Sequence, residues 1–210
     1  MDIERAEGIV LRTQPVTESS LLVTWFTREF GKLKTLAKGA RRPKSPMRGK
    51  LDLFYRDELL FLRSRRSDLH LLHDCFLEEP HASLRESVDR LTAASYVCEL
   101  VDLAMEVEDA HPRLFDLLDQ ALEDVEKDAG AMLLVWFELQ LLAGAGWAPR
   151  WHEVSGICRI LQSLAVAGHA GARRVRLTEA QAAEAREVLG RFWMEQVGKL
   201  PRSGQSMTKT

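Results

Sequence analysis

The spacing of apolar residues changes once along this chain, near Glu78. Before that point apolar side chains recur at every second position, which is the period of a half-buried β-strand. After it they recur at three- and four-residue steps, which is the period of an amphipathic helix. The sequence therefore predicts an α+β chain: an OB-fold β-barrel domain over residues 1–77, an α-helical domain over residues 78–200 and a flexible tail over residues 201–210.

Five strands are expected in the first domain. The segments with alternating apolar residues are 7–13, 21–28, 32–38, 51–62 and 68–73. Five short strands at this spacing can close into an OB-fold barrel, whose ligand surface is the face of the second and third strands with the flanking loops. An SH3-like barrel is the structural alternative, and strand counting does not exclude it.

The second and third strands are predicted to form a hairpin around Gly31, because glycine readily adopts the positive φ that a tight turn needs. In the third strand Lys34 and Lys38 share one face, and Leu33 and Ala37 share the opposite face. The two lysines are therefore expected to point the same way on one side of the sheet.

Four helices are predicted after Glu78. The apolar stripe of the first consists of Leu84, Val88, Leu91, Ala94, Cys98, Val101 and Met105. The second begins with Pro112 in its first turn, and the third, over residues 131–143, is apolar almost all round, so it is expected to be the buried central helix. The last begins at Thr178, which opens a capping box. Residues 147–176 are expected to be irregular.

Residues 32–50, called the basic segment below, carry eight cations and no acid. Because the segment starts inside one predicted strand and leads into another, it is expected to be a loop displayed by the sheet. A solvated surface loop is the alternative, and the absence of interleaved acids argues against it. Each phosphate that a cation neutralises releases counterions, so the segment predicts nucleic-acid binding without sequence preference. The predicted DNA contacts are these eight cations and two arginines of a neighbouring turn: Lys32, Lys34, Lys38, Arg41, Arg42, Lys44, Arg48, Lys50, Arg65 and Arg66.

Base stacking on aromatic side chains would add to these phosphate contacts. The aromatic residues close to the basic segment in sequence are Trp25, Phe26, Phe30, Phe54 and Tyr55. Adjacent strand residues point to opposite faces, so at most one member of each adjacent pair is expected to be available.

Charge is distributed unevenly along the chain. Residues 1–73 hold 15 Lys+Arg and 9 Asp+Glu, residues 74–138 hold 4 and 17, and residues 139–210 hold 10 and 5. The formal net charge is only -2, but local field rather than net charge decides where a polyanion binds. The acidic middle is expected to repel DNA.

The bulk composition indicates a cytoplasmic protein. The N-terminus lacks the basic and apolar regions of a signal peptide, and no apolar run is long enough to cross a membrane. Cys75, Cys98 and Cys158 are odd in number and far apart, which fits a reducing compartment.

No motif predicts an enzyme, a cofactor or a metal site. The chain has no phosphate-binding glycine loop and no nucleophile elbow. The side chains that zinc would need occur as His70, His73, Cys75 and His81, and again as His152, Cys158 and His169. Neither group has paired CxxC spacing, so ordinary structural residues are the preferred interpretation.

Residues 8–104 resemble the bacterial recombination mediator family RecO. The resemblance is carried by TESSLLVTWFT, FGKLKTLAKGARRPKS and GKL in the barrel domain, and by LTAASYVCELVD and PRLFDLLDQAL in the helical domain. WFELQLLAGAGWAP resembles the family's helix that ends in a Gly-Trp or Gly-Tyr step, and VGKLPRS is a weaker similarity near the C-terminus. Many relatives carry a four-cysteine zinc module after the position of Pro149, whereas this chain keeps only Cys158 there, so residues 147–176 resemble a reduced remnant of that module.

The resemblance implies a non-enzymatic mediator of DNA repair and homologous recombination. Such a protein binds single- and double-stranded DNA, anneals complementary strands, and helps load a RecA-type recombinase onto strands coated by single-strand-binding protein. The implied partners are RecR and the C-terminal tail of single-strand-binding protein. An apolar pocket with a nearby arginine is the expected receptor for that tail, and the candidate arginines are Arg150, Arg173, Arg174 and Arg176.

Two other functions remain open at this stage. One is a general OB protein that binds single-stranded DNA or RNA without a mediator role. The other is a protein–protein adaptor whose basic segment docks an acidic partner.

Overall fold

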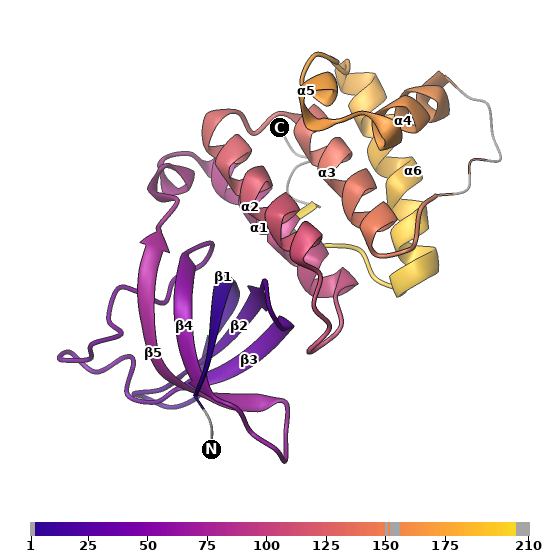
Figure 1. Cartoon of the computed structure of the whole chain (residues 1–210). Helices are drawn as coiled ribbons and strands as arrows, with labels where there is room; N and C mark the ends of the chain where they lie inside the picture. Colours follow the sequence, from indigo (N-terminus) through magenta and orange to yellow (C-terminus); the bar gives the residue numbers. More distant parts are fainter. Residues whose placement is uncertain (1–2, 150, 152–155, 205–210) are drawn as a thin grey trace. The chain divides into compact units, whose positions relative to one another are not determined.

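The computed structural model describes residues 3–149, 151 and 156–204, which form two compact units (Figure 1). The barrel unit comprises Met1–Ala82 and Met105–Asp119, and the helical unit comprises Ser83–Ala104 and Gln120–Thr210. The barrel unit therefore takes in a stretch from the predicted helical region.

Five strands close the barrel in the order β1-β2-β3-β5-β4. Their bounds are β1 Ile3–Pro15, β2 Leu21–Thr27, β3 Gly31–Ala37, β4 Arg56–Leu62 and β5 Leu69–Glu79. β3 and β5 run parallel, and the other neighbouring pairs are antiparallel. This five-stranded OB-like barrel followed by helices confirms the predicted fold class.

Alternating side chains fill the barrel interior, as the period of two requires. Leu33, Thr35 and Ala37 of β3 are buried, and Lys34 lies on the other face, as predicted. Trp25 is fully buried, and its indole Nε1 donates a hydrogen bond to Thr35 Oγ1 at 2.8 Å, which satisfies both polar groups in the core.

The β2–β3 turn is built around Gly31, whose φ of 67° confirms the prediction. A Cβ at this position would lie 1.8 Å from the backbone oxygen of Asp109. Next to it, the backbone N–H of Glu108 donates to the Lys32 carbonyl at 3.0 Å. Glycine thus serves both the turn and the close approach of residues 108–109.

The strand predicted over residues 51–62 is too long by five residues, because β4 begins at Arg56. Phe54 has a φ of 70°, which an extended strand cannot accommodate. Its backbone N–H donates to the Val10 carbonyl at 2.9 Å, and the Val10 N–H donates to the Tyr55 carbonyl at 2.9 Å. The Phe54 side chain is buried in the barrel unit, and this burial accompanies the turn of the backbone at Phe54.

The helical unit is built around α3 (Ala131–Gly144), which contacts α1 (Val88–Ala104), α4 (Gly156–Val166), α5 (His169–Ala172) and α6 (Glu179–Val197) (Figure 1). The prediction of a buried central helix is confirmed. α2 (Pro112–Lys127) starts at the predicted proline, and its apolar residues Leu114, Leu118, Ala121 and Val125 are buried. A short 3-10 helix, η1 (Ala82–Glu86), precedes α1.

Three details of the helical prediction are wrong. Leu84 and Met105 were expected in the stripe of the first helix, but α1 runs only from Val88 to Ala104, so both lie outside it. Val88 and Leu91 were expected in the buried stripe of the first helix, but they are 79% and 41% exposed. α4 and α5 occupy part of the stretch 147–176 that was expected to be irregular. Leu161 and Leu164 of α4 are buried, so tertiary packing stabilises a helix whose local signals are weak.

The last long helix begins as predicted. The hydroxyl of Thr178 accepts from the backbone N–H of Gln181 at 3.2 Å, and Gln181 Oε1 accepts from the Thr178 N–H at 2.9 Å, which completes the capping box. No helix among the described residues is long and apolar enough to cross a membrane.

Candidate nucleic-acid interface

The basic segment continues from β3 into a chain of tight turns rather than an open loop. The backbone N–H groups of Arg42, Ser45 and Arg48 each donate to the carbonyl three residues earlier, at 3.0 to 3.2 Å. Ala40 and Met47 are 4% and 7% exposed and belong to the barrel core. Two buried anchors therefore hold the segment against the barrel.

The turns carry their charges outward. The cations of the segment that are exposed are Lys38, Arg41, Arg42, Lys44 and Arg48. Lys32 and Lys34 are half-buried on the outer face of β3, while Arg65 and Arg66 are exposed in the β4–β5 turn. The structure thus brings most of the predicted cations to the surface of the barrel unit, and their contact with DNA stays a prediction.

Arg41 ties the basic segment to the β1–β2 loop. Its backbone N–H donates to the Ser19 carbonyl at 3.0 Å, and its guanidinium Nη1 donates to the Thr17 carbonyl at 3.0 Å. The guanidinium of Arg48 donates to the Pro43 carbonyl at 3.2 Å within the segment. Arginine keeps further N–H donors after making one such bond, so both side chains can still meet phosphate.

Lys50 lies at the base of the segment and is held against β5. Its Nζ donates to the Cys75 carbonyl at 3.0 Å and lies 5.5 Å from the centroid of the Phe76 ring. Close by, both carboxylate oxygens of Asp57 are buried without a hydrogen-bond partner. Burial raises the pKa of Asp57 to about 8, the positive charge of Lys50 opposes the shift, and Glu78 adds to it. Asp57 is therefore mostly protonated at neutral pH, and it adds little negative charge beneath the cations.

Most of the aromatic residues suggested as stacking partners are unavailable. Trp25, Phe26 and Phe54 are 0%, 0% and 1% exposed, so no base can reach them. Phe30 is half-buried and packs edge-on against Phe61, with ring centroids 5.6 Å apart. Tyr55 is also half-buried and is packed against the barrel core.

The histidines and the cysteine near β5 do not converge. Cys75 is buried in the barrel core, and His73 of the same strand is exposed. His70 is buried, stacks on Phe61 and lies 2.8 Å from Glu108. Among the described residues, no group of three or more His, Cys, Asp or Glu side chains could hold a metal ion. His152 of the second group considered lies outside the described residues.

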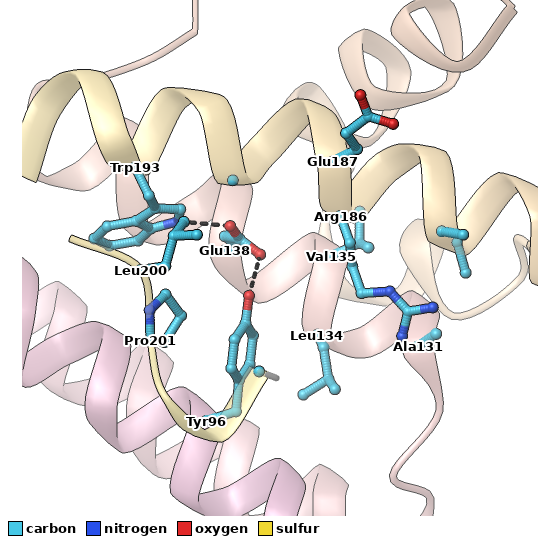
Figure 2. A pocket seen from close by; sticks show the side chains of 14 residues that line it. Tyr96, Ala131, Leu134, Val135, Glu138, Arg186, Glu187, Trp193, Leu200 and Pro201 are labelled. Atoms are coloured by element: carbon cyan, nitrogen blue, oxygen red, sulfur yellow. Dashed lines mark hydrogen bonds between the residues drawn. The ribbon is translucent and has the colours of Figure 1, made fainter. Parts of the chain in front are cut away.

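The helical unit contains an apolar pocket of about 380 Å³ between α1, α3 and α6 (Figure 2). Glu138 forms part of its wall and is 2% exposed. Tyr96 Oη donates to one carboxylate oxygen at 2.8 Å and Trp193 Nε1 donates to the other at 2.5 Å. Burial raises the pKa of Glu138 to about 7, although these two hydrogen bonds oppose the shift. Figure 2 shows the Arg186 side chain, from α6, beside the pocket away from this hydrogen-bonded cluster.

The arginines predicted to receive a partner tail do not line this pocket. Arg173 and Arg176 line a smaller, polar hollow of about 160 Å³. In that hollow Arg173 Nη1 lies 3.2 Å from Asp124 Oδ1, so its charge is already partnered. Arg174 is exposed and lines neither space, and Arg150 lies outside the described residues.

Sequence reasoning missed two residues that the structure makes prominent. Arg186 was overlooked because it stands in an ordinary charged helix, and only packing of α6 on α3 brings it to the pocket. Phe76 was overlooked because the predicted strand ended at residue 73, whereas β5 continues to Glu79. Extending the alternation of that strand would have placed Cys75 and Phe76 on opposite faces.

Two family profiles match this chain. The profile described as Recombination protein O N terminal matches residues 1–80, and the one described as Recombination protein O C terminal matches residues 85–159. The chain belongs to the RecO family. The first RecO profile covers the barrel and the whole basic segment, and the second covers α1, α2 and α3.

Several proteins named DNA repair protein RecO are similar to this chain. That of Syntrophus aciditrophicus (strain SB) is 38% identical over 146 residues, which is 69% of this chain and 56% of the relative. That of Rhodopirellula baltica is 34% identical over 143 residues, or 68% and 53%. That of Listeria monocytogenes serotype 4b is 33% identical over 148 residues, or 70% and 57%. The chain thus spans little more than half the length of the curated RecO relatives that it matches.

Proposed function

We propose that this protein is a non-enzymatic mediator of DNA repair and recombination. In this proposal it binds single- and double-stranded DNA through the basic segment, anneals complementary strands, and helps load recombinase onto strands coated by single-strand-binding protein. The observation that carries the proposal is a folded, acid-free basic segment on an OB-like barrel in a chain of the RecO family. The similar proteins are named for DNA repair, which supports the role.

The physical basis is charge neutralisation. Two DNA strands repel each other through their phosphates, and a surface that carries several exposed cations lowers that repulsion. Ala40 and Met47 hold the turns in place, so the cations are presented without a large ordering cost on binding. Strands held on such a surface can approach each other and pair.

The test is annealing of complementary oligonucleotides that have been coated with single-strand-binding protein. Wild type is expected to accelerate annealing, and the variant with Arg41, Arg42 and Lys44 changed to Ala is expected to lose that acceleration. Since three phosphate contacts are removed, the slope of log affinity against log salt should fall by about 2 to 3. A matched variant with exposed cations of the helical unit changed to Ala (Arg159, Arg191 and Lys199) has the same charge change and should anneal as wild type does.

Arg41 also contacts the β1–β2 loop, so a second variant separates charge from folding. Arg42 and Lys44 are exposed, and changing both to Gln keeps the Arg41 contact with the Thr17 carbonyl. In this double variant, the slope of log affinity against log salt should lose the contributions of about two phosphate contacts. Full annealing activity in both basic-segment variants would place the DNA site elsewhere. DNA binding by wild type without any annealing would favour a general OB protein, and absence of binding at moderate salt would favour an adaptor.

For the partner in the helical unit, the proposal is the acidic, apolar C-terminal tail of single-strand-binding protein. The apolar pocket with Arg186 beside it has the chemistry that such a tail needs. Of the four arginines predicted from the sequence, Arg173 and Arg176 line the polar hollow, and that hollow is the competing receptor. RecR and a RecA-type recombinase are the further partners of the proposed mediator.

A further inference from the structure

Phe76 is the most exposed aromatic side chain of the described residues. The chain has 8 Phe, 5 Trp and 2 Tyr residues, and apart from Phe76 these side chains are buried or half-buried. Phe76 is 47% exposed. Leaving a phenyl ring in water forfeits hydrophobic stabilisation, so its position is informative.

β5 fixes the ring on the outer surface of the barrel. Cys75 points into the core and is fully buried, so Phe76 must point out. Glu58 of β4 lies directly across from Phe76 and is paired with Arg5, and Glu78 lies 3.9 Å from Arg56. Two acids close to the ring, Glu58 and Glu78, therefore each have an arginine of the barrel nearby.

Lys50 joins this ring to the basic segment. Its ammonium group lies over one face of the ring, 5.5 Å from the ring centroid, and is fixed by its hydrogen bond to the Cys75 carbonyl. An ammonium group has three N–H donors, so two remain for a phosphate. An aromatic ring with a cation next to it is a combination that binds unpaired nucleotides, because a base stacks on the ring face that the cation does not cover while the cation meets the phosphate.

We propose that Phe76 and Lys50 form a stacking site for an unpaired nucleobase and its phosphate, at the base of the basic segment. The inference rests on the proposed DNA binding and deepens it. The cations of the turns bind either form of DNA, whereas Phe76 favours single strands, since the bases of a duplex are already stacked on each other. The site gives the annealing protein a hold on a strand before that strand pairs.

The test compares Phe76→Ala with wild type on single-stranded and duplex oligonucleotides of equal length. Stacking on one aromatic ring changes affinity by about 5- to 150-fold. Phe76→Ala is expected to bind single strands more weakly than wild type by that factor, whereas its affinity for duplex DNA and its slope of log affinity against log salt should be unchanged. Phe76→Tyr should restore single-strand affinity, and Phe76→Leu, which keeps apolar bulk without an aromatic face, should not. Leu77→Ala is the matched control, because Leu77 is an exposed apolar neighbour at 38%.

Oligonucleotides with abasic sites provide an independent readout. Removing bases from a single strand should lower its affinity for wild type to the affinity that Phe76→Ala has for the intact strand. The same removal should have little further effect on the affinity of Phe76→Ala. If wild type binds DNA and Phe76→Ala or Phe76→Leu binds single strands equally well, the stacking site is refuted while the proposed function stands. If wild type binds neither form of DNA, the proposed function fails and the stacking site fails with it.

Discussion

Asp57→Asn should change how the stability of the barrel unit depends on pH. Asp57 is 0% exposed, and neither carboxylate oxygen has a hydrogen-bond partner. Its pKa is raised by burial from 3.8 to about 8. One pKa unit corresponds to about 1.4 kcal/mol, so the full shift corresponds to about 6 kcal/mol.

The direction follows from proton binding. Below about pH 4 the folded and unfolded states both hold the proton, and Asp57 adds no pH dependence. Between about pH 4 and 8 the folded state keeps a proton that the unfolded state releases, so the free energy of unfolding falls as pH rises. Above about pH 8 both states are ionised and the loss is complete. Asn has a similar size and no charge, so Asp57→Asn should match wild type near pH 4 and be more stable by several kcal/mol near pH 8.

The assay is hydrogen exchange of β4 and β5 amides across a urea series, which reports on the barrel unit rather than on the whole chain. Measurements at pH 5, 6.5 and 8 span the window set by the two pKa values. Asp68→Asn is the control, because Asp68 is exposed in the β4–β5 turn of the same unit. Parallel pH profiles for wild type and Asp57→Asn would refute the reasoning, since they would mean that Asp57 is ionised in the folded barrel.

Two further predictions concern a turn and a pocket. Gly31 and Gly49 both have positive φ, but a Cβ at Gly31 meets the Asp109 backbone whereas one at Gly49 meets nothing within 4 Å. Gly49→Ala should therefore lower the free energy of unfolding, measured in urea, by about 1–2 kcal/mol. Gly31→Ala should lower it by at least ~2 kcal/mol more. Equal losses in the two variants would contradict the close approach of the Asp109 backbone to Gly31. Arg186→Ala should weaken binding of a fluorescent tail peptide of single-strand-binding protein about tenfold, or ~1.4 kcal/mol. If Arg186→Ala binds the peptide as wild type does and Arg173→Ala binds it more weakly, the peptide binds in the polar hollow instead.

Local sequence signals predicted the elements whose stability depends on near neighbours. The alternation in β3, the glycine of the β2–β3 turn, the capping box at Thr178 and the apolar third helix each involve residues within a few positions of one another. The eight cations of the basic segment needed no structure to be recognised. For these features the backbone period or a single special residue is decisive.

Long-range contacts decided the rest. β4 begins only at Arg56 because the backbone of Phe54, with its positive φ, pairs with Val10, which is distant in sequence. Val88 and Leu91 share the helical period of the buried residues of α1 and are nevertheless exposed. Asp57 is buried without a partner, Phe76 lies in water beside Lys50, and Arg186 lies beside an apolar pocket. A sequence period tells which side chains share a face, but burial depends on what packs against that face. The sequence by itself therefore determined the order of the five strands and of the longer helices α1, α2, α3 and α6, together with the charge of the basic segment. Only the tertiary structure decided which of those side chains a ligand can reach.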